Sequence, residues 1–207
     1  PIIDEDLAPG DILYIPPGFP HDGFTHETAL NYSVGFRGPN GRDLISSFAD
    51  YALENDLGGE HYSDPDLTCR EHPGRVEEYE LERLRQMMIA MISQPDDFRD
   101  WFGSFISTPR HELDIAPAEP EYTTEEVLDA LLGGETLTRL SGLRVLNIGG
   151  SFFINSEKLE TVDATAADAL CRYTELGQAE LGAALQNPAF VEELTGLINQ
   201  GYWFFDE

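Results

Sequence analysis

The stretch GDILYIPPGFPHDGFTHETALNYSVGFR, residues 10–37, carries the most distinctive pattern in this chain of 207 residues. We predict three short strands here, over residues 11–15, 21–24 and 29–36, because apolar runs alternate with turn signals. The intervening Pro16-Pro17-Gly18-Phe19-Pro20 cannot continue a strand, since its prolines lack a backbone donor and its glycine accepts positive φ. The sequence therefore places one histidine, His21, directly after a rigid corner.

Residues 29–36 alternate between two kinds of side chain. Small residues take every second position and bulky apolar residues take the others: Asn31, Ser33 and Gly35 against Leu30, Tyr32, Val34 and Phe36. In a strand, this period of two puts the small polar groups on one face and the apolar groups on the other. A polar inner face beside a fixed imidazole suits a small β-barrel that holds a metal and a small anionic ligand.

The motif PGDILYIPPGFPHDG, followed by NYSVGFR, resembles the second half of a JmjC-type oxygenase domain, which is a double-stranded β-helix of the cupin kind. In that family two histidines and a carboxylate bind Fe(II), and 2-oxoglutarate is the co-substrate. The resemblance continues through SFADY, GGEHYSDPDL, FISTPRHELDIAPAEPEY and GYWFFDE. Over nearly the whole chain it is similar to the bacterial ribosomal oxygenases, which hydroxylate an arginine of large-subunit ribosomal protein number sixteen.

The resemblance implies a role for one residue above all. His21 matches the distal histidine of the metal-binding triad, and Asn31 and Ser33 would hydrogen-bond co-substrate or substrate. Two alternatives stay open: His21 as a buried structural histidine, and Asn31 with Ser33 as ordinary interior polar residues. His26, in a Thr25–Thr28 loop, is expected to be solvated.

The chain departs from this family at the other two metal ligands. These form a His-x-Asp pair before the PGDILY strand, and no His-x-Asp occurs anywhere in this sequence. One histidine cannot form the facial triad that leaves iron open positions. We therefore expect a fragment that lacks the N-terminal half of the oxygenase domain and is inactive alone, although a removed initiator Met before Pro1 stays possible.

The charge of the chain favours a basic partner. Twelve Lys and Arg residues face 39 Asp and Glu residues, for a formal net charge of −27. Such a surface repels nucleic-acid phosphates and steers basic proteins such as ribosomal proteins, although acidity that serves only solubility or salt adaptation stays open. No run of 18 apolar residues predicts a membrane span, and Cys69 and Cys171 are expected as free, buried thiols in a cytoplasmic protein.

The predicted architecture is α+β, in four parts. Residues 1–39 are the remnant of the JmjC/cupin barrel, 40–108 a helical region, 109–121 a proline-rich linker, and 122–207 a winged-helix-like domain. The helical region is expected to form a bundle from helices over residues 42–57, 76–93 and 96–106. By resemblance to the ribosomal oxygenases, this bundle pairs two subunits into a homodimer.

The last part reads as a small α+β unit. Predicted elements are a helix to residue 132, strands over 136–140, 144–148 and 151–154, helices over 166–176 and 188–198, and a short strand or plug over 202–205. The order resembles a winged helix, but the expected recognition helices are acidic. Asp168 and Glu175 outweigh Arg172, and Glu192 and Glu193 have no basic neighbour in their helix. We therefore expect a protein-contact or structural module rather than a nucleic-acid binder.

Three functions compete on these grounds. The leading one is a 2-oxoglutarate-dependent protein hydroxylase that needs ligands from outside this chain. A non-enzymatic acidic scaffold and a regulator built from a cupin and a winged helix are the alternatives. A zinc site at His61, Cys69 and His72 has irregular spacing and is disfavoured, and His111 is expected to dock the linker rather than bind metal.

Overall fold

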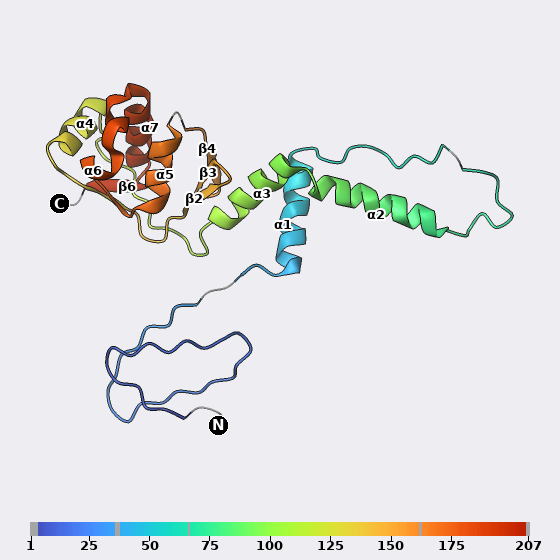
Figure 1. The fold of residues 1–207 in the computed structure, drawn as a ribbon, viewed down its shortest axis with the longest axis horizontal. Coiled ribbons are helices and arrows are strands. Elements are labelled where there is room, and N and C mark those ends of the chain that lie inside the picture. Colours follow the sequence, from blue (N-terminus) through green and yellow to red (C-terminus); the bar gives the residue numbers. More distant parts are fainter. Residues whose placement is uncertain (1–3, 36–37, 66, 162, 206–207) are drawn as a thin grey trace. The chain divides into compact units, whose positions relative to one another are not determined.

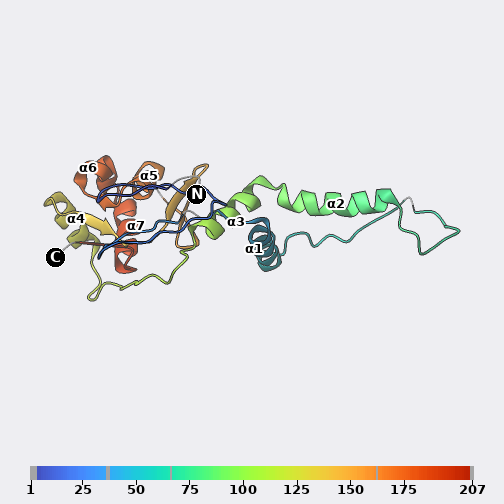
Figure 2. The same cartoon turned by 90° about the horizontal axis from the view of Figure 1, so that it is seen from below.

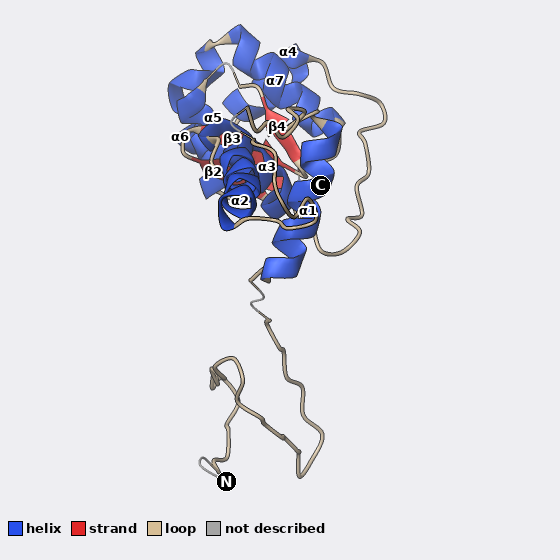
Figure 3. Ribbon diagram, turned by 90° about the vertical axis from the view of Figure 1, so that its right-hand side faces the viewer, coloured by secondary structure: helices blue, strands red, loops and turns tan. Residues whose placement is uncertain are grey.

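The structure is a computed structural model that describes residues 4–35, 38–65, 67–161 and 163–205. The chain divides into two compact units, Pro1–Pro39 and Asn40–Glu207. The N-terminal unit consists of loops throughout its described residues, whereas the second unit contains the helices and strands (Figure 1, Figure 3). We describe each unit by itself.

Two Pro-Gly turns give the N-terminal unit its local structure. The amide of Asp11 donates to the carbonyl of Ala8 at 3.0 Å, and the amide of Phe19 donates to the carbonyl of Pro16 at 3.3 Å. The glycines of the two turns, Gly10 and Gly18, have φ of +96° and +82°. Proline followed by a glycine with positive φ is the pattern of a type II turn, so the corner predicted after residue 15 is confirmed.

The three predicted strands of this unit are not formed in the structure. Residues 4–35 contain no strand pairing, and the predicted ends at Phe36 and Arg37 lie outside the described residues. A strand needs a neighbour for its backbone groups and a layer for its apolar face. Here the apolar side chains that would face a barrel layer lie in solvent: Ile12 is 95% exposed and Tyr32 is 87% exposed.

The second unit holds every helix and strand of the described chain, in an order close to the predicted one. The helices are α1 (Gly41–Glu54), α2 (Glu78–Ile92), α3 (Pro95–Ser107), α4 (Thr124–Leu132), α5 (Ala164–Arg172), α6 (Gln178–Leu181), the 3-10 helix η1 (Gly182–Gln186) and α7 (Pro188–Asn199). The strands are β1 (Leu137–Arg139), β2 (Val145–Ile148), β3 (Ser151–Ile154), β4 (Glu157–Leu159), β5 (Glu175–Leu176) and β6 (Trp203–Phe205).

Helices α1 and α3 pack on each other through an aromatic cluster. Phe48 of α1 meets Trp101 of α3 edge to face, with ring centroids 5.1 Å apart. The indole nitrogen of Trp101 donates to the hydroxyl of Ser47 at 3.0 Å. Trp101 is 3% exposed, and the hydroxyl of Ser47 satisfies the polar edge of its buried ring. The predicted helices over 42–57 and 96–106 are thus confirmed, except that α1 ends at Glu54.

The predicted three-helix bundle is formed only in part, because α2 buries no residue. Met91 joins the cluster between α1 and α3, but the rest of the apolar stripe of α2 lies open. Leu81 is 51% exposed and Met88 is 65% exposed. A stripe of this kind on one helix needs another surface to cover it, and the described residues supply none along most of its length.

Ion pairs join the loop between α1 and α2 to α2. Figure 2 shows the course of this loop between the two helices. Arg83 of α2 donates to Asp64 of the loop at 2.8 Å, and the Asp64 side chain is only 4% exposed. Arg70 of the loop donates to Glu80 of α2 at 2.7 Å. The same guanidinium donates to the hydroxyl of Tyr79 at 2.9 Å. Although the sequence of this loop is polar, it is held against α2 at several points.

The main core lies in the winged-helix part of the second unit. Strand β1 is central in a three-stranded antiparallel sheet of order β5-β1-β6, and α4 and α7 pack with it. Leu137 of β1 pairs with Leu176 and Phe205, and Arg139 pairs with Trp203. The residues that are fully buried include Val127, Leu131, Leu137, Leu170, Leu176, Phe190, Leu194 and Trp203.

The wing is a separate antiparallel sheet of order β2-β3-β4, and α3 packs on it. Gly103 of α3 lies directly against the ring of Phe153, where a Cβ would collide. The guanidinium of Arg144 donates to the carbonyl of Ile106 at 2.8 Å, and Lys158 pairs with Asp100 at 2.9 Å. These contacts join residues that come before and after the linker at 109–121, where the sequence led us to place a domain boundary.

Most C-terminal elements lie where the sequence placed them, with one clear correction. The strands predicted over 144–148 and 151–154 form an antiparallel hairpin through Gly149-Gly150, a pair that signals such a turn and has φ of +61° and +91° as type I′ requires. The helix predicted to Leu176 ends at Arg172 instead, and Glu175–Leu176 forms β5. Arg139 donates to the carbonyls of Leu170 and Cys171 at 3.2 and 3.5 Å, which satisfies the helix end.

The linker is docked on the C-terminal part. The amide of Ala118 donates to the carbonyl of Asn199 at 3.0 Å. The side chain of Asn199 accepts from the amide of Tyr122 at 2.9 Å and donates to its carbonyl at 3.0 Å. No helix in the described part of the chain is long and apolar enough to cross a membrane.

Candidate functional site

His21 follows the Pro16–Phe19 turn directly, and one of its ring nitrogens is engaged with that turn. The Nδ1 atom lies 3.2 Å from the carbonyl oxygen of Phe19. Because a carbonyl only accepts hydrogen bonds, this contact is a hydrogen bond in those forms of the ring that carry a proton on Nδ1. The Nε2 atom has no hydrogen-bond partner among the described residues. A neutral imidazole with a free nitrogen is the form in which histidine binds metals.

Asn31 and Ser33 lie in the same unit as His21, but the structure does not organise them around it. Both side chains are exposed, and neither forms a hydrogen bond within residues 4–35. His26 lies edge to face against Phe24, with ring centroids 5.2 Å apart, and is exposed as expected. The predicted roles of Asn31 and Ser33 in ligand binding therefore stay predictions.

The donor set present in the described chain does not complete a metal site. No group of three or more His, Cys, Asp or Glu residues gathers within the described ranges. His61, Cys69 and His72 are exposed. A 2-His-1-carboxylate iron site needs three protein ligands on one face. His21 has the chemistry of one such ligand, and the other two would have to come from outside the described residues.

The two cysteines are free thiols, as expected. The expectation that both are buried is wrong for Cys69, which lies exposed in the loop between α1 and α2, whereas Cys171 is partly covered at the end of α5. Burial raises the pKa of the Cys171 thiol to about 11, and the carboxylate of Asp168 adds to this effect. A thiol with a raised pKa is a poor nucleophile, so Cys171 has the character of a structural residue.

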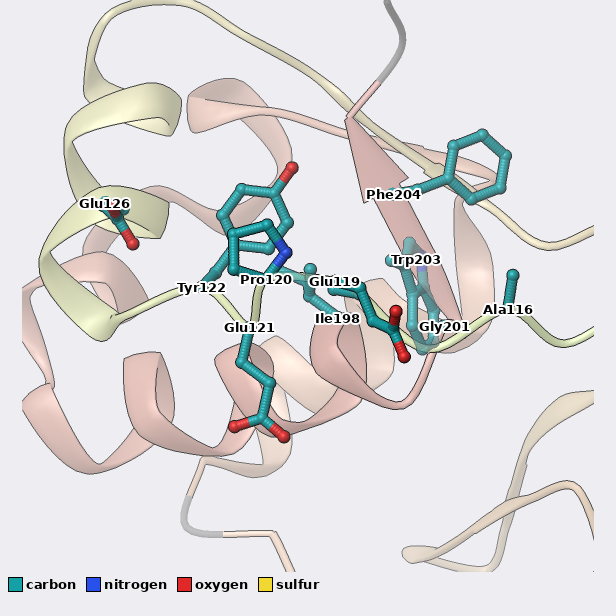
Figure 4. A pocket seen from close by; sticks show the side chains of 11 residues that line it. Ala116, Glu119, Pro120, Glu121, Tyr122, Glu126, Ile198, Gly201, Trp203 and Phe204 are labelled. Carbon is teal, nitrogen blue, oxygen red and sulfur yellow. The ribbon is translucent and has the colours of Figure 1, made fainter.

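The second unit also contains an open pocket between the linker and the end of the core (Figure 4). Its volume is about 280 Å³. Glu119, Glu121 and Tyr122 line it from the linker, and Trp203 and Phe204 line it from β6. The indole nitrogen of Trp203 is buried without a hydrogen-bond partner in the structure. The carboxylates give the pocket an acidic rim over an aromatic floor.

The helices of the winged-helix part carry few cations in positions to meet phosphates. Arg172 of α5 lies over the ring of Tyr173, with its guanidinium carbon 5.3 Å from the centroid. Asp168 on the same helix accepts from Asn147 at 3.0 Å, and Glu193 of α7 accepts from Thr161 at 3.1 Å. In α5 the charges of Asp168 and Arg172 balance, because Glu175 lies in β5 and not in the helix predicted to contain it. Helix α7 contains Glu192 and Glu193 but no Lys or Arg, and phosphates repel such carboxylates.

In the comparison with known protein families, one family matches the N-terminal segment of the chain and another matches its C-terminal part. The ROXA-like winged helix family matches residues 90–204, and the JmjC domain family matches residues 1–44. The first match covers more than half of the chain and begins before α3, in keeping with the contacts between α3 and the wing. The chain belongs to the ROXA-like winged helix family, and its N-terminal segment has the sequence of part of a JmjC domain.

Two relatives carry this further. The chain is 56% identical over 205 residues to the ribosomal protein uL16 3-hydroxylase of Escherichia coli K12, covering 99% of this chain and 55% of that protein. It is 28% identical over 128 residues to a probable ribosomal oxygenase of Haemophilus influenzae, covering 54% and 30%. The chain thus spans about half the length of the first relative and less of the second.

Solved structures of the ribosomal oxygenase YcfD from Escherichia coli resemble this chain closely. One has a TM-score of 0.94 at 55% identity, covering 100% of this chain and 57% of that one. Another, in complex with cobalt and 2-oxoglutarate, has a TM-score of 0.93 at 55% identity, covering the same shares. The resemblance to JmjC-type ribosomal oxygenases is therefore confirmed.

Sequence reasoning missed two features of this part of the molecule. It predicted the rigid corner before His21 but not the contact between the carbonyl of Phe19 and Nδ1 of that histidine. It also missed the acidic pocket. Only the folded chain brings the linker near Trp203, so no local signal marks that pocket.

Proposed function

We propose that this chain contributes the distal histidine to an Fe(II)- and 2-oxoglutarate-dependent oxygenase that hydroxylates an arginine of large-subunit ribosomal protein number sixteen. The observation that carries the proposal is His21, with Nδ1 held by a turn and Nε2 open, inside a segment that matches a JmjC domain. The identity of 56% to a uL16 3-hydroxylase supports the substrate class.

The residues of this chain have limited but definite roles in such an enzyme. The imidazole of His21 binds Fe(II) through Nε2, and a His-x-Asp pair from outside this sequence supplies the remaining protein ligands. Iron and 2-oxoglutarate, when bound, supply the oxidising power for hydroxylation. Asn31 and Ser33 hydrogen-bond the co-substrate or the substrate once the strand over residues 29–36 is paired in a double-stranded β-helix.

The chain of 207 residues is inactive alone on this proposal, because one histidine cannot hold the metal in an open facial site. The test compares this chain with a longer polypeptide, in which it is joined to the part of the E. coli relative that it does not cover. With Fe(II), 2-oxoglutarate and the ribosomal protein, the longer form should consume oxygen and increase the mass of the ribosomal protein by that of one oxygen atom, because hydroxylation converts a C–H group into C–OH. Absence of both effects would refute the enzymatic role.

Residues 40–108 are proposed to pair two copies of the chain. The exposed apolar face of α2, which includes Leu81, Leu84, Met88 and Ile92, supports this proposal because a second copy would cover it. Light scattering of the intact chain should give the mass of a dimer. Replacing Leu84 with Glu should give a monomer, whereas replacing exposed Glu78 with Lys at the start of the same helix should leave the dimer intact.

The winged-helix part is proposed to contact protein rather than nucleic acid, in the cytoplasm where ribosomal proteins are made. Its support is the pair of carboxylates on α7, a helix without Lys or Arg, and the formal charge of −27 for the whole chain. Binding to a basic ribosomal protein should weaken steeply with salt. A gel shift with duplex DNA at low salt tests the regulator alternative, and tight binding would favour it.

A further inference from the structure

The turn before His21 has a specific chemical consequence. We propose that the Pro16–Phe19 turn is a positioning device that fixes the tautomer of His21, with Gly18 as the residue on which the device depends. This inference rests on the proposed function for its purpose, since a fixed tautomer matters when Nε2 binds a metal. Its chemical content, the position of one proton, can be tested without any metal.

The first step concerns the carbonyl of Phe19. It is the last carbonyl of a four-residue turn closed by the bond from Phe19 to Pro16, at 3.3 Å. Pro20 follows, and proline restricts the residue before it to extended conformations. The carbonyl direction at Phe19 is therefore set from both sides. It lies 3.2 Å from Nδ1 of His21, within hydrogen-bond distance.

The second step concerns Gly18. Its φ is +82°, in the region that residues with a Cβ rarely adopt. A Cβ at this position would meet no other atom within 4 Å, so space is not the constraint. The backbone conformation alone demands glycine, or asparagine as the next best residue. Alanine at this position would oppose the turn and so move the Phe19 carbonyl away from the imidazole.

The third step concerns the ring. A carbonyl at Nδ1 favours the tautomer with the proton on Nδ1, because the other tautomer would place two lone pairs face to face. Metal-binding histidines commonly donate their second ring N–H to a carbonyl or carboxylate, which orients the ring and sets its basicity. The turn thus prepares Nε2 to bind. His26 lies against Phe24 instead, and no described carbonyl contacts its ring nitrogens.

The experiment measures the tautomer directly in the full chain of 207 residues. Two-bond ¹H–¹⁵N correlation spectra at about pH 8.5, two units above the ordinary histidine pKa, distinguish the two neutral forms. The spectrum of His21→Ala assigns the signal among the five histidines. We expect the Nδ1–H form to predominate for His21 and the Nε2–H form to predominate for His26.

Three variants distinguish the effect of the turn on the His21 tautomer from a general disturbance of the N-terminal unit. Gly18→Ala should lower the ratio of the Nδ1–H to the Nε2–H form of His21 by about fivefold, the effect of one ordinary hydrogen bond. Gly18→Asn should restore most of the ratio, because asparagine tolerates positive φ. Gly23→Ala is the matched control: Gly23 is even closer in sequence to His21 than Gly18 is, has no positive φ and has open space at its Cβ, so this change should leave the ratio as it is.

A second readout separates this inference from the proposed function. In the longer polypeptide described above, Gly18→Ala should weaken Co²⁺ binding by about 10–100-fold, as second-shell changes at metal sites do. A His21 that is protonated on Nε2 in the wild type, or a ratio that Gly18→Ala leaves unchanged, overturns the inference. If the Nδ1–H form of His21 predominates but His21→Ala leaves the Co²⁺ affinity of the longer polypeptide unchanged, the proposed function is overturned and the inference about the turn stands.

Discussion

Phe24 and Phe190 are the same residue type in opposite surroundings. Phe24 belongs to the N-terminal unit and is 80% exposed, whereas Phe190 lies in the first turn of α7 in the winged-helix part and is completely buried. The sequence around Phe24 has strand-like patterning that is at least as clear as the helical pattern around Phe190. The structure nevertheless forms α7 and leaves residues 4–35 without strand pairing.

The difference lies in where each region finds its partners. Helix α7 satisfies its backbone internally and packs on α4 and β6, which are close in the same unit. A strand satisfies its backbone only through a neighbouring strand. Residues 4–35 have the apolar alternation of strands but find no pairing neighbour among the described residues. The role proposed for His21 as a metal ligand likewise depends on groups that the described residues do not bring near it.

Hydrogen exchange gives the largest expected contrast between the two regions. Buried amides of α7 should open only with global unfolding, with free energies of about 5–15 kcal/mol, whereas most amides of residues 11–34 should exchange almost freely. The amides of Asp11 and Phe19, which close the turns, are the internal control and should be slightly slower. Strong protection across residues 11–34 in a monomer would break the comparison.

Truncating the two phenylalanines measures the same contrast in stability. Phe190→Ala should lower the free energy of unfolding by about 3–5 kcal/mol, because it empties a buried aromatic site. Phe24→Ala should change it by less than about 0.5 kcal/mol, as exposed substitutions do. Urea unfolding followed by helical circular dichroism measures both. Equal costs for the two variants would mean that Phe24 is buried in solution.

Substitutions at two glycines test how closely α3 and α7 are packed in the second unit. Gly103→Ala puts a methyl group into the ring of Phe153, so it should destabilise the junction of α3 and the wing by about 1–3 kcal/mol. Gly196→Ala lies within α7 with open space at its Cβ and should instead stabilise by about 0.5–1 kcal/mol. Thermal unfolding of the two variants should give shifts of opposite sign. Shifts of the same sign would show that α3 is not packed on the wing as described.

The smallest expected effect is the pH dependence of the clamp between the loop and α2. The guanidinium of Arg70 and the amide of Glu77 lower the pKa of Glu80 from its ordinary 4.5 to about 2. Since the folded-state pKa is depressed, the contribution of Glu80 to stability is present above about pH 4.5 and is lost as the pH falls toward 2.

A carboxyl titration by NMR checks this directly. In Arg70→Gln the pKa of Glu80 should rise toward its ordinary value, because the largest cause of the shift is removed. The control is Arg75→Gln, which removes a more exposed pair with Glu77 at 3.0 Å and should leave Glu80 nearly unchanged. A Glu80 pKa near 4.5 in the wild type would show that the loop is not fastened to α2.

Local signals predicted the helices well because their causes are local. Pro95 at the start of α3, the Thr123–Glu126 capping box of α4 and Asn187-Pro188 before α7 are all readable from the sequence and all act in the structure. The Gly149-Gly150 hairpin is of the same kind. Such features need only their immediate neighbours.

Features that depend on distant partners were predicted less well. The short strand β5 replaces the end of a predicted helix because Leu176 pairs with Leu137, almost 40 positions away in the chain. The apolar stripe of α2 predicted a packed helix, but the described residues leave it largely open. The candidate site shows the same division. His21 and the turn before it could be predicted from the local sequence, whereas a set of metal ligands that meet in space could not.

The most direct test of the central claim is the Co²⁺ affinity of the longer polypeptide, measured for the wild type, His21→Ala and the neighbouring control His26→Ala. The account predicts that His21→Ala loses more affinity than the roughly 10–100-fold expected of a second-shell change, and that His26→Ala binds like the wild type. Binding by His21→Ala as tight as that of the wild type would contradict the claim that this chain supplies one ligand of an iron site.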